Sequence, residues 1–268
     1  MIHTIEVLIL LSIQKWPKSS TRLKTGGIRL SHVLKRKKYK HYALITARAG
    51  SKSIPNKNLQ ILGQRTIIDR AIRNALIFNK FDGRFISTDI EVILQKYQGN
   101  FRLRTIRRPE ELCTDTAIMK DVVKHAISVI NPPPKSYLWL LQPTSPFRTT
   151  EDFDCIFNLL EKAAPNSLIS VCEVGANHPH RMYTVGENSK TLSPLRRTNF
   201  KNKQDLLKTY IRNGCFYVVN VEKFLENETF DIHPCLPYYM PEDQSINIDS
   251  PWDLEVARLK ASKEGKYL

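Results

Sequence analysis

Cationic and small polar residues are concentrated in the stretch ALITARAGSKSIPNKNL, residues 43–59, directly after a short apolar run. The set comprises Arg48, Gly50, Ser51, Lys52, Lys57 and Asn58. Glycine lets a ligand approach the backbone, amides and hydroxyls donate hydrogen bonds, and the cations supply positive charge. Together they suit a polyphosphate, although the spacing matches neither GxGxxG nor GxxxxGK followed by Ser or Thr. Taken alone, the stretch is equally compatible with a solvated surface loop.

The elements that must position this stretch are predicted from the apolar periodicity. Strands are expected at residues 42–46, 84–88, 101–107, 136–142, 167–174, 214–221 and 245–249. Helices are expected at residues 66–79 and 118–130, after a cap at Thr150, and from Ser250 onward. Strands that alternate with helices indicate a mostly parallel sheet covered on both faces. Because such sheets bind ligands at the carboxyl ends of their strands, the loop after the first strand lies where a ligand would bind.

The charge of the chain is concentrated at its N-terminal end. The 268 residues carry a formal net charge of +15, and 41% of them are apolar, as in ordinary soluble proteins. Residues 1–40 hold 10 Lys or Arg and one acid, so they are predicted to be a basic, poorly ordered extension before a domain at residues 41–268. The mildly basic remainder suits a small anionic substrate. A basic nucleic-acid-binding protein is the alternative from a different class, and it lacks an interleaved aromatic and basic stripe.

Location is inferred from the apolar segments and the cysteines. The run IEVLILLSI is shorter than the roughly 20 residues that cross a bilayer, so no membrane partner is expected. Five scattered cysteines without a CxxC pair favour the reducing cytoplasm and argue against a zinc site. The basic cluster at residues 35–38 is also compatible with a nuclear targeting signal or a polyanion contact.

Five blocks of the sequence, taken in order, resemble one family. ARAGSKSIPNKNL closely resembles the signature of the acylneuraminate cytidylyltransferases, the CMP-sialic acid synthetases. The blocks that agree in order and spacing are STD (87–89), RRPEELCTDTA (107–117), LLQPTSPFR (140–148), and RNGCFYV with INIDSPWDL near the end. The resemblance covers about residues 42–260. It implies a three-layer α/β/α, Rossmann-like nucleotidyltransferase fold with a mostly parallel sheet and a small inserted dimerisation arm.

The resemblance also implies a reaction. CTP and a nine-carbon, sialic-acid-like 2-keto sugar acid (a nonulosonic acid) would give a CMP-sugar and pyrophosphate, with Mg²⁺ as cofactor and a homodimer as the assembly. The polar segment 175–210 is the expected arm. The sugar could be N-acetylneuraminate, legionaminate, pseudaminate or a relative. A Kdo cytidylyltransferase is less favoured because LLQPTSPFR is not its pattern, and another sugar nucleotidyltransferase is less favoured because the blocks match in series.

The nucleotide contacts implied by the resemblance lie in the first three blocks. Arg48 and Lys52 are assigned to the triphosphate and to catalysis, because they would offset charge on the leaving pyrophosphate. The other nucleotide-binding residues implied are Gly50, Ser51, Lys57, Asn58, Arg108 and Ala117. Ala117 lies where backbone groups of the family read cytosine, and Met119 stands where the family often has Ser. Asp115, in the same block, is equally compatible with a cap on the helix that follows.

The sugar and metal contacts implied by the resemblance lie in the later blocks. Gln142, Arg212 and Asn213 are assigned to the sugar or its carboxylate. Asn247 and Asp249 would project to the same side of a strand, and their oxygen atoms suit Mg²⁺. Asp249 is therefore assigned to the metal and to catalysis, with Asn247 beside it. Many members of the family read D-x-D here, so this chain keeps a single carboxylate.

Four further residues are open to more than one interpretation. Arg148 is interpreted as a structural cation at a helix entry on a solvated face. Asp89 is a weaker metal candidate, and a cap role at the end of its strand is favoured. Asn202 and Lys203 stand where the family usually has two Arg, and Lys cannot reproduce the forked hydrogen bonding of Arg, so the sugar contacts of the arm stay open.

Overall fold

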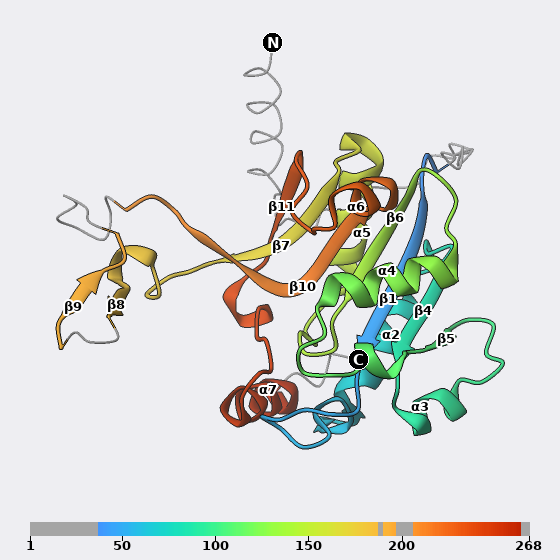
Figure 1. Ribbon diagram of the computed structural model, residues 1–268, viewed down its shortest axis with the longest axis horizontal. Helices are drawn as coiled ribbons and strands as arrows, with labels where there is room; N and C mark the ends of the chain where they lie inside the picture. The colour runs from blue at the N-terminus through green and yellow to red at the C-terminus, as the bar shows by residue number, and fades with distance from the viewer. Residues whose placement is uncertain (1–36, 187–189, 197–205, 264–268) are drawn as a thin grey trace, which may run out of the picture. The chain divides into compact units, whose positions relative to one another are not determined.

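A seven-stranded sheet is the centre of the fold in the computed structural model, which describes residues 37–186, 190–196 and 206–263 (Figure 1). The strand order is β11-β7-β10-β6-β1-β4-β5. The strands are β1 (Lys40–Ala47), β4 (Gly83–Thr88), β5 (Arg104–Arg107), β6 (Ser136–Leu141), β7 (Ser167–Glu173), β10 (Tyr210–Asn220) and β11 (Cys235–Tyr239). β1 is parallel to β4 and β6, β4 to β5, and β7 to β11, whereas β10 is antiparallel to β6 and β7. The predicted mostly parallel sheet is confirmed.

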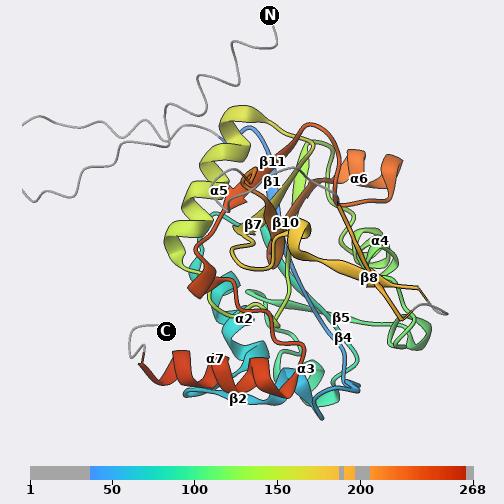
Figure 2. The same cartoon turned by 90° about the vertical axis from the view of Figure 1, so that its left-hand side faces the viewer.

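Helices cover both faces of this sheet (Figure 2). The helices of the described ranges are α2 (Ile67–Ile77), α3 (Glu91–Lys96), α4 (Met119–Ile130), α5 (Thr150–Ala163), α6 (Val221–Asn227) and α7 (Pro251–Lys263). Ala43 and Ile45 of β1 pack with buried residues of α2 and α5, whereas Leu44 packs with those of α4 and α6. Because successive strand residues point to opposite faces, α2 with α5 and α4 with α6 form the two outer layers. The three-layer prediction is confirmed.

Short elements connect these layers. Two small hairpins pair β2 (Ile61–Leu62) with β3 (Arg65–Thr66) and β8 (Tyr183–Val185) with β9 (Leu192–Pro194). The 3-10 turns are η1 (Lys57–Leu59), η2 (Glu110–Leu112), η3 (Pro179–Arg181) and η5 (Glu242–Gln244). No helix within the described ranges is long and apolar enough to cross a bilayer.

Three element predictions need correction, and one edge strand was missed. Residues 245–249 do not form a strand, because their backbone runs past the end of β6 with one bond, from Ile248 N–H to the Thr144 carbonyl (2.8 Å), in place of a ladder. The strand expected at 101–107 begins only at Arg104. Thr149, rather than Thr150, caps α5 in a capping box with Asp152. The edge strand β11, which contains a proline and only partly buried residues, has too weak an apolar pattern to have been predicted.

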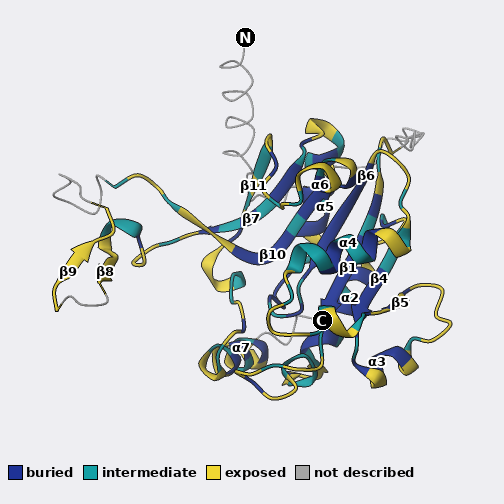
Figure 3. Cartoon of the chain, in the orientation of Figure 1, coloured by how far each residue is buried: buried dark blue, intermediate teal, exposed yellow. Residues whose placement is uncertain are grey.

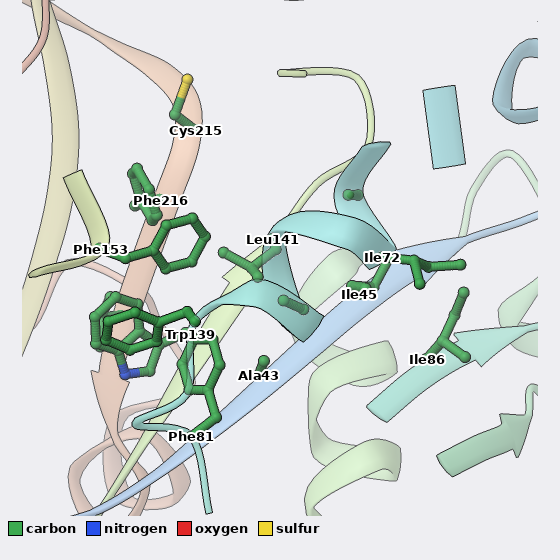
Figure 4. Close-up of a cluster of buried hydrophobic side chains, with 14 of the residues drawn as sticks. Ala43, Ile45, Ile72, Phe81, Ile86, Trp139, Leu141, Phe153, Cys215 and Phe216 are labelled. Atoms are coloured by element: carbon green, nitrogen blue, oxygen red, sulfur yellow. The ribbon is translucent and has the colours of Figure 1, made fainter. Parts of the chain in front are cut away.

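The core of the sheet is aromatic (Figure 4). Trp139 of the central strand β6 is fully buried, and its ring stacks on Phe153 of α5 with centroids 6.1 Å apart. Phe153 in turn meets Phe216 of β10 edge-on at 5.0 Å. All six residues of β6 are buried, which is typical of a strand covered on both faces. This packing fixes the strand whose carboxyl end reaches Gln142.

The hairpin β8–β9 is inserted between β7 and β10, within the segment expected to be an arm. It projects beyond the ends of these two strands and is coloured as exposed in Figure 3. Its apolar side chains have little cover: Tyr183, Val185 and Leu192 are 57%, 62% and 66% exposed. The segment 197–205, which includes Asn202 and Lys203, lies outside the described residues, as do residues 1–36 of the predicted extension.

A buried histidine lies at the end of β1 opposite the polar loop. His41 is fully buried, and Trp139 Nε1 donates to its Nδ1 at 3.1 Å. Since an indole only donates, Nδ1 must accept, so the ring proton is on Nε2 and donates to Glu161 at 3.0 Å. Burial lowers the pKa of His41 below its ordinary value of 6.5, and Glu161 only partly opposes this. His41 is therefore neutral in the folded protein at pH 7.

Acidification is expected to destabilise the fold through His41. Below pH 6.5 the unfolded chain takes up a proton at this residue before the folded protein does, so stability falls as the pH falls toward the lowered pKa. Urea unfolding of the wild type and of His41→Gln at pH 7.5 and 5.5 measures this. Gln can still accept from Trp139 and donate to Glu161 but does not titrate. The wild type should lose more stability across this interval, and equal losses would contradict the assignment.

Candidate active site

A polar cavity of about 340 Å³ lies at the carboxyl ends of β1 and β6. Nine of the residues singled out from the sequence line it: Arg48, Gly50, Ser51, Lys57, Asn58, Arg108, Gln142, Asn247 and Asp249. They come from the loop after β1, from the segment after β5, from the end of β6 and from the segment before α7. The fold therefore brings residues that are about 200 positions apart in the sequence into one site. This site lies at the carboxyl ends of the strands, where a ligand was expected.

Two cations of the loop after β1 share one carboxylate. Asp115 forms ion pairs with Arg48 Nη2 and, at 2.8 Å, with Lys52 Nζ, and Arg48 Nη1 also donates to the Cys113 carbonyl at 3.3 Å. The hydrogen bonds from Lys52 and then Arg48 lower the pKa of Asp115. Asp115 does not cap the next helix, because the N-cap of α4 is Ile118 and receives no side-chain bond. Lys52 is largely exposed and does not line the cavity.

The backbone of this loop is held from two sides. Asp89, directly after β4, accepts a hydrogen bond from the Ala49 N–H at 2.8 Å, and Asn58 Nδ2 donates to the Arg48 carbonyl at 2.9 Å. Asp89 does not cap the following helix, because the N-cap of α3 is Ile90 and no side chain bonds to this helix start. Both side chains thus fix the conformation in which Arg48 is presented.

A buried guanidinium forms one wall of the cavity. Arg108 is 5% exposed and donates to Ser87 through Nε (3.2 Å to Oγ) and Nη2 (2.8 Å to the carbonyl). Burial lowers its pKa from the ordinary value, without removing its charge at neutral pH. Met119 lines the same cavity at the start of α4 and brings a thioether in place of a hydroxyl. Ala117 lies outside the lining, two residues earlier.

A carboxylate and an amide lie on the opposite side of the cavity. Asp249 accepts from Lys57 Nζ at 3.4 Å and from Asn247 Nδ2, and Lys57 also donates to the Ile248 carbonyl at 3.0 Å. Asn247 Oδ1 accepts from Ser145 at 3.3 Å. Asn247 and Asp249 therefore do face the same side, although the segment is not a strand. Ser250 and Asp253 form a capping box that starts α7 directly behind them.

Gln142 directly follows β6 and lines the cavity. Its carbonyl accepts from Ser145 N–H at 3.2 Å and from Arg148 Nη2 at 2.7 Å. Gly214 of β10 passes close by with a positive φ of 78°, and a Cβ there would come within 2.7 Å of Ser145 Oγ. Glycine is thus required both for the backbone conformation and for the approach to the Gln142 turn.

Arg148 was expected on a solvated face, and this is wrong. It is 4% exposed and also donates from Nε to the Cys215 carbonyl at 2.6 Å. The arginine thus ties the Gln142 turn to β10 from inside the protein. A single sequence cannot show this, because the local sequence around an Arg at a helix entry does not reveal whether its side chain points to solvent or to the interior.

Two residues assigned to the sugar differ in their surroundings. Asn213 is buried and its amide bonds to Ser170 (2.6 Å) and Ser245 (2.8 Å), so its side chain supports β10 and does not agree with a direct ligand contact. Arg212, the preceding residue, is exposed on β10 at the base of the arm and lies outside the cavity lining.

A family model described as cytidylyltransferase matches residues 42–233, which is well over half of the chain. This chain belongs to the cytidylyltransferase family. The match spans the loop after β1, Asp115, the Gln142 turn and β10, and it ends before Asp249.

Individual relatives of this cytidylyltransferase carry more specific names. The N-acylneuraminate cytidylyltransferase of Escherichia coli is 32% identical over 221 residues, covering 80% of this chain and 50% of its own length. The CMP-N,N'-diacetyllegionaminic acid synthase of Legionella pneumophila is 28% identical, covering 79% of this chain and 91% of its own. The chain spans about half the length of the first of these relatives.

A solved structure supports the same fold for this cytidylyltransferase. CMP:2-keto-3-deoxy-manno-octonic acid synthetase complexed with CTP superposes with a TM-score of 0.60 at 15% identity, covering 84% of this chain and 99% of that one. At this identity the likeness shows the fold alone. The Rossmann-like α/β nucleotidyltransferase fold implied by the sequence is confirmed.

Proposed function

We propose that this protein forms a CMP-sugar and pyrophosphate from CTP and a nonulosonic acid. The observation that carries the proposal is the meeting, in one cavity, of the cations Arg48, Lys57 and Arg108 with the carboxylate of Asp249 and the amide of Gln142. Cations suit a triphosphate, a carboxylate suits its metal, and an amide that both donates and accepts suits a polyol. The names of the relatives support this combination.

The proposed chemistry is displacement at the α-phosphorus of CTP. The oxygen of the anomeric hydroxyl forms the new P–O bond and its proton is released to water, while the bond from the α-phosphorus to the bridging oxygen of the β-phosphate breaks and pyrophosphate leaves. Arg48 and Lys52 would bind the leaving phosphates and offset their growing charge. Lys57 would hold the triphosphate from the side of Asp249. Arg108 and the backbone near Ala117 would hold the cytidine, with Met119 against it.

Mg²⁺ is part of the proposal, and the residues present fit it. Within the described residues, no group of three His, Cys, Asp or Glu could hold a metal ion by itself. Mg²⁺ is commonly bound by one or two carboxylates, with water and substrate phosphates completing its shell. Asp249, 67% exposed at its side chain, would supply the carboxylate and Asn247 an amide oxygen or a bound water. When bound, the ion would neutralise phosphate charge.

The sugar pocket and the assembly extend the proposal. Gln142 would contact the sugar at the cavity mouth, and Arg212 would reach its carboxylate from the base of the arm. The exposed apolar residues of β8–β9 favour a homodimer in which this hairpin packs on a second copy. The five cysteines, all of them free thiols, agree with a cytoplasmic location.

Pyrophosphate release tests the proposal directly. The protein is incubated with CTP, Mg²⁺ and one sugar acid at a time: N-acetylneuraminate, legionaminate, pseudaminate or Kdo. We expect release with one of the nine-carbon acids. Release with Kdo alone would favour the second candidate, a Kdo-type enzyme, whose support is the fold shared with the octonic acid synthetase. No release with any acid, and no CTP binding by calorimetry, would refute the proposal.

Asp115 is expected to compete with the triphosphate. It neutralises Arg48 and Lys52 without ligand, and such solvent-accessible ion pairs are weak enough for a triphosphate to displace them. Replacing Asp115 with Asn should therefore tighten CTP binding by roughly 2- to 10-fold. Calorimetric titration without Mg²⁺ measures this, with Glu111→Gln as the control that removes one charge from the same segment. Weaker binding in Asp115→Asn alone would show that the carboxylate orients the cations instead.

A further inference from the structure

A second cavity of about 340 Å³ is lined by residues of α2 and α5, the two helices that form one outer layer of the fold. It is lined by residues of α2, by the segment before α5 and by the first turn of α5: Arg70, Asn74, Ile77, Phe78, Pro146, Arg148, Thr149, Thr150, Glu151 and Phe153. None of these residues lines the proposed active site. The two cavities are nevertheless linked, because Arg148 lines the second and holds the Gln142 turn of the first.

Arg148 brings a buried charge without a carboxylate partner to this cavity. Its Nε and Nη2 donate to carbonyls, while its Nη1 has no hydrogen-bond partner among the described residues. Asp152 interacts electrostatically with Arg148. The oxygens of Asp152, however, accept hydrogen bonds from Tyr238 Oη (2.9 Å) and from the Thr149 N–H (2.7 Å). Burial lowers the pKa of Arg148 to about 10, so the group stays cationic at neutral pH. The Phe216 ring lies 5.4 Å from this guanidinium, and a buried cation that lacks a hydrogen-bonded carboxylate would be stabilised further by an anion.

Other donors converge on the same cavity. Asn74 Nδ2 of α2 is also buried without a partner among the described residues. Arg70, 5% exposed, adds a second guanidinium, whose Nε donates to the Leu62 carbonyl at 2.9 Å. The 14-residue helix α5 begins here, and the first N–H groups of a helix carry partial positive charge. The single carboxylate of the lining, Glu151, is exposed.

We propose that this second cavity binds a small oxyanion of the phosphate class. Two guanidinium groups, an amide and a helix N-terminus match the several acceptor oxygens of such an ion. The apolar side chains Ile77, Phe78 and Phe153 reduce the screening of these contacts by water. The source is either free orthophosphate or pyrophosphate. An anion on Arg148 would also fix the turn that presents Gln142, and this consequence rests on the proposed function.

Calorimetry on the full chain tests the site. Orthophosphate and pyrophosphate are titrated into Arg48→Ala protein, in which anion binding at the first site is weakened. The proposal of a second anion site can then fail without the proposed function failing, and the reverse also holds. In this background, Asn74→Leu should weaken anion binding by about 5- to 10-fold through loss of one donor. Glu151→Gln should strengthen it by about 2- to 5-fold through loss of one repulsive charge. Asn79→Leu, an exposed position just beyond α2, is the matched control and should change nothing.

Each outcome of these titrations either supports the second anion site or overturns it. Tighter binding of pyrophosphate supports the site with the reaction product as its source, and tighter binding of orthophosphate supports it with the free ion. Malonate that binds as well as orthophosphate would overturn the phosphate class. The absence of saturable binding, or affinities that neither Asn74→Leu nor Glu151→Gln changes, would overturn the site itself. Circular dichroism melting of each variant confirms that it is folded before it is titrated.

Discussion

Replacing Arg48 with alanine is expected to lower turnover of CTP by roughly 10²-fold or more, the effect of removing one donor that stabilises charge in a transition state. Arg48 is held by Asn58 at its carbonyl and by the Cys113 carbonyl and Asp115 at its guanidinium. It is thus presented to the cavity before any ligand binds. Its contribution should therefore appear in kcat as well as in KM.

Steady-state kinetics of pyrophosphate release measure this effect. Arg48→Lys keeps the charge but loses the forked geometry, so its turnover should lie between those of the wild type and Arg48→Ala. Arg65→Ala, an exposed position in β3, is the control and should turn over normally. Near-normal kcat in Arg48→Ala would remove this residue from the chemistry. The loss of an exposed ion pair with Asp115 should hardly change stability.

The second large effect is expected at Asp249. Its replacement by Asn deletes the carboxylate at the proposed metal site, so the Mg²⁺ concentration that gives half-maximal activity should rise by about 10-fold or more. Lys57, whose Nζ is 3.4 Å from this carboxylate, would lose this ion pair at the same time and keep its hydrogen bond to the Ile248 carbonyl. The shift should therefore be seen in the Mg²⁺ titration itself and not only in the maximal rate.

At Asn247, two residues before Asp249, a carboxylate can be added instead of removed. Asn247→Asp places a second carboxylate next to Asp249, with which Asn247 now shares a hydrogen bond, and should lower the Mg²⁺ requirement. Asp243→Asn, which removes an exposed carboxylate that pairs with Lys260, is the control. If the Mg²⁺ titration is the same in Asp249→Asn and in the wild type, the metal is bound elsewhere.

Sequence patterns predicted the parts of the site that are local. A buried strand must end before charged residues begin, so the run at residues 43–59 placed Arg48 and Asn58 in a loop at the strand's carboxyl end. The layered fold followed for the same reason, because alternating strand and helix periods leave few ways to bury apolar faces. The capping box of Ser250 with Asp253 was visible as well, since its residues are three positions apart.

Three features depended on chain segments that are distant in sequence. Asp115 pairs with cations more than 60 positions earlier, Arg148 is turned inward by the carbonyls of Gln142 and Cys215, and residues 245–249 lie along the end of β6 without joining the sheet. The sequence of a segment determines which groups it offers and how they repeat along it. Which distant group each one meets is decided by the packing of the whole domain, because burial and charge pairing depend on neighbours in space.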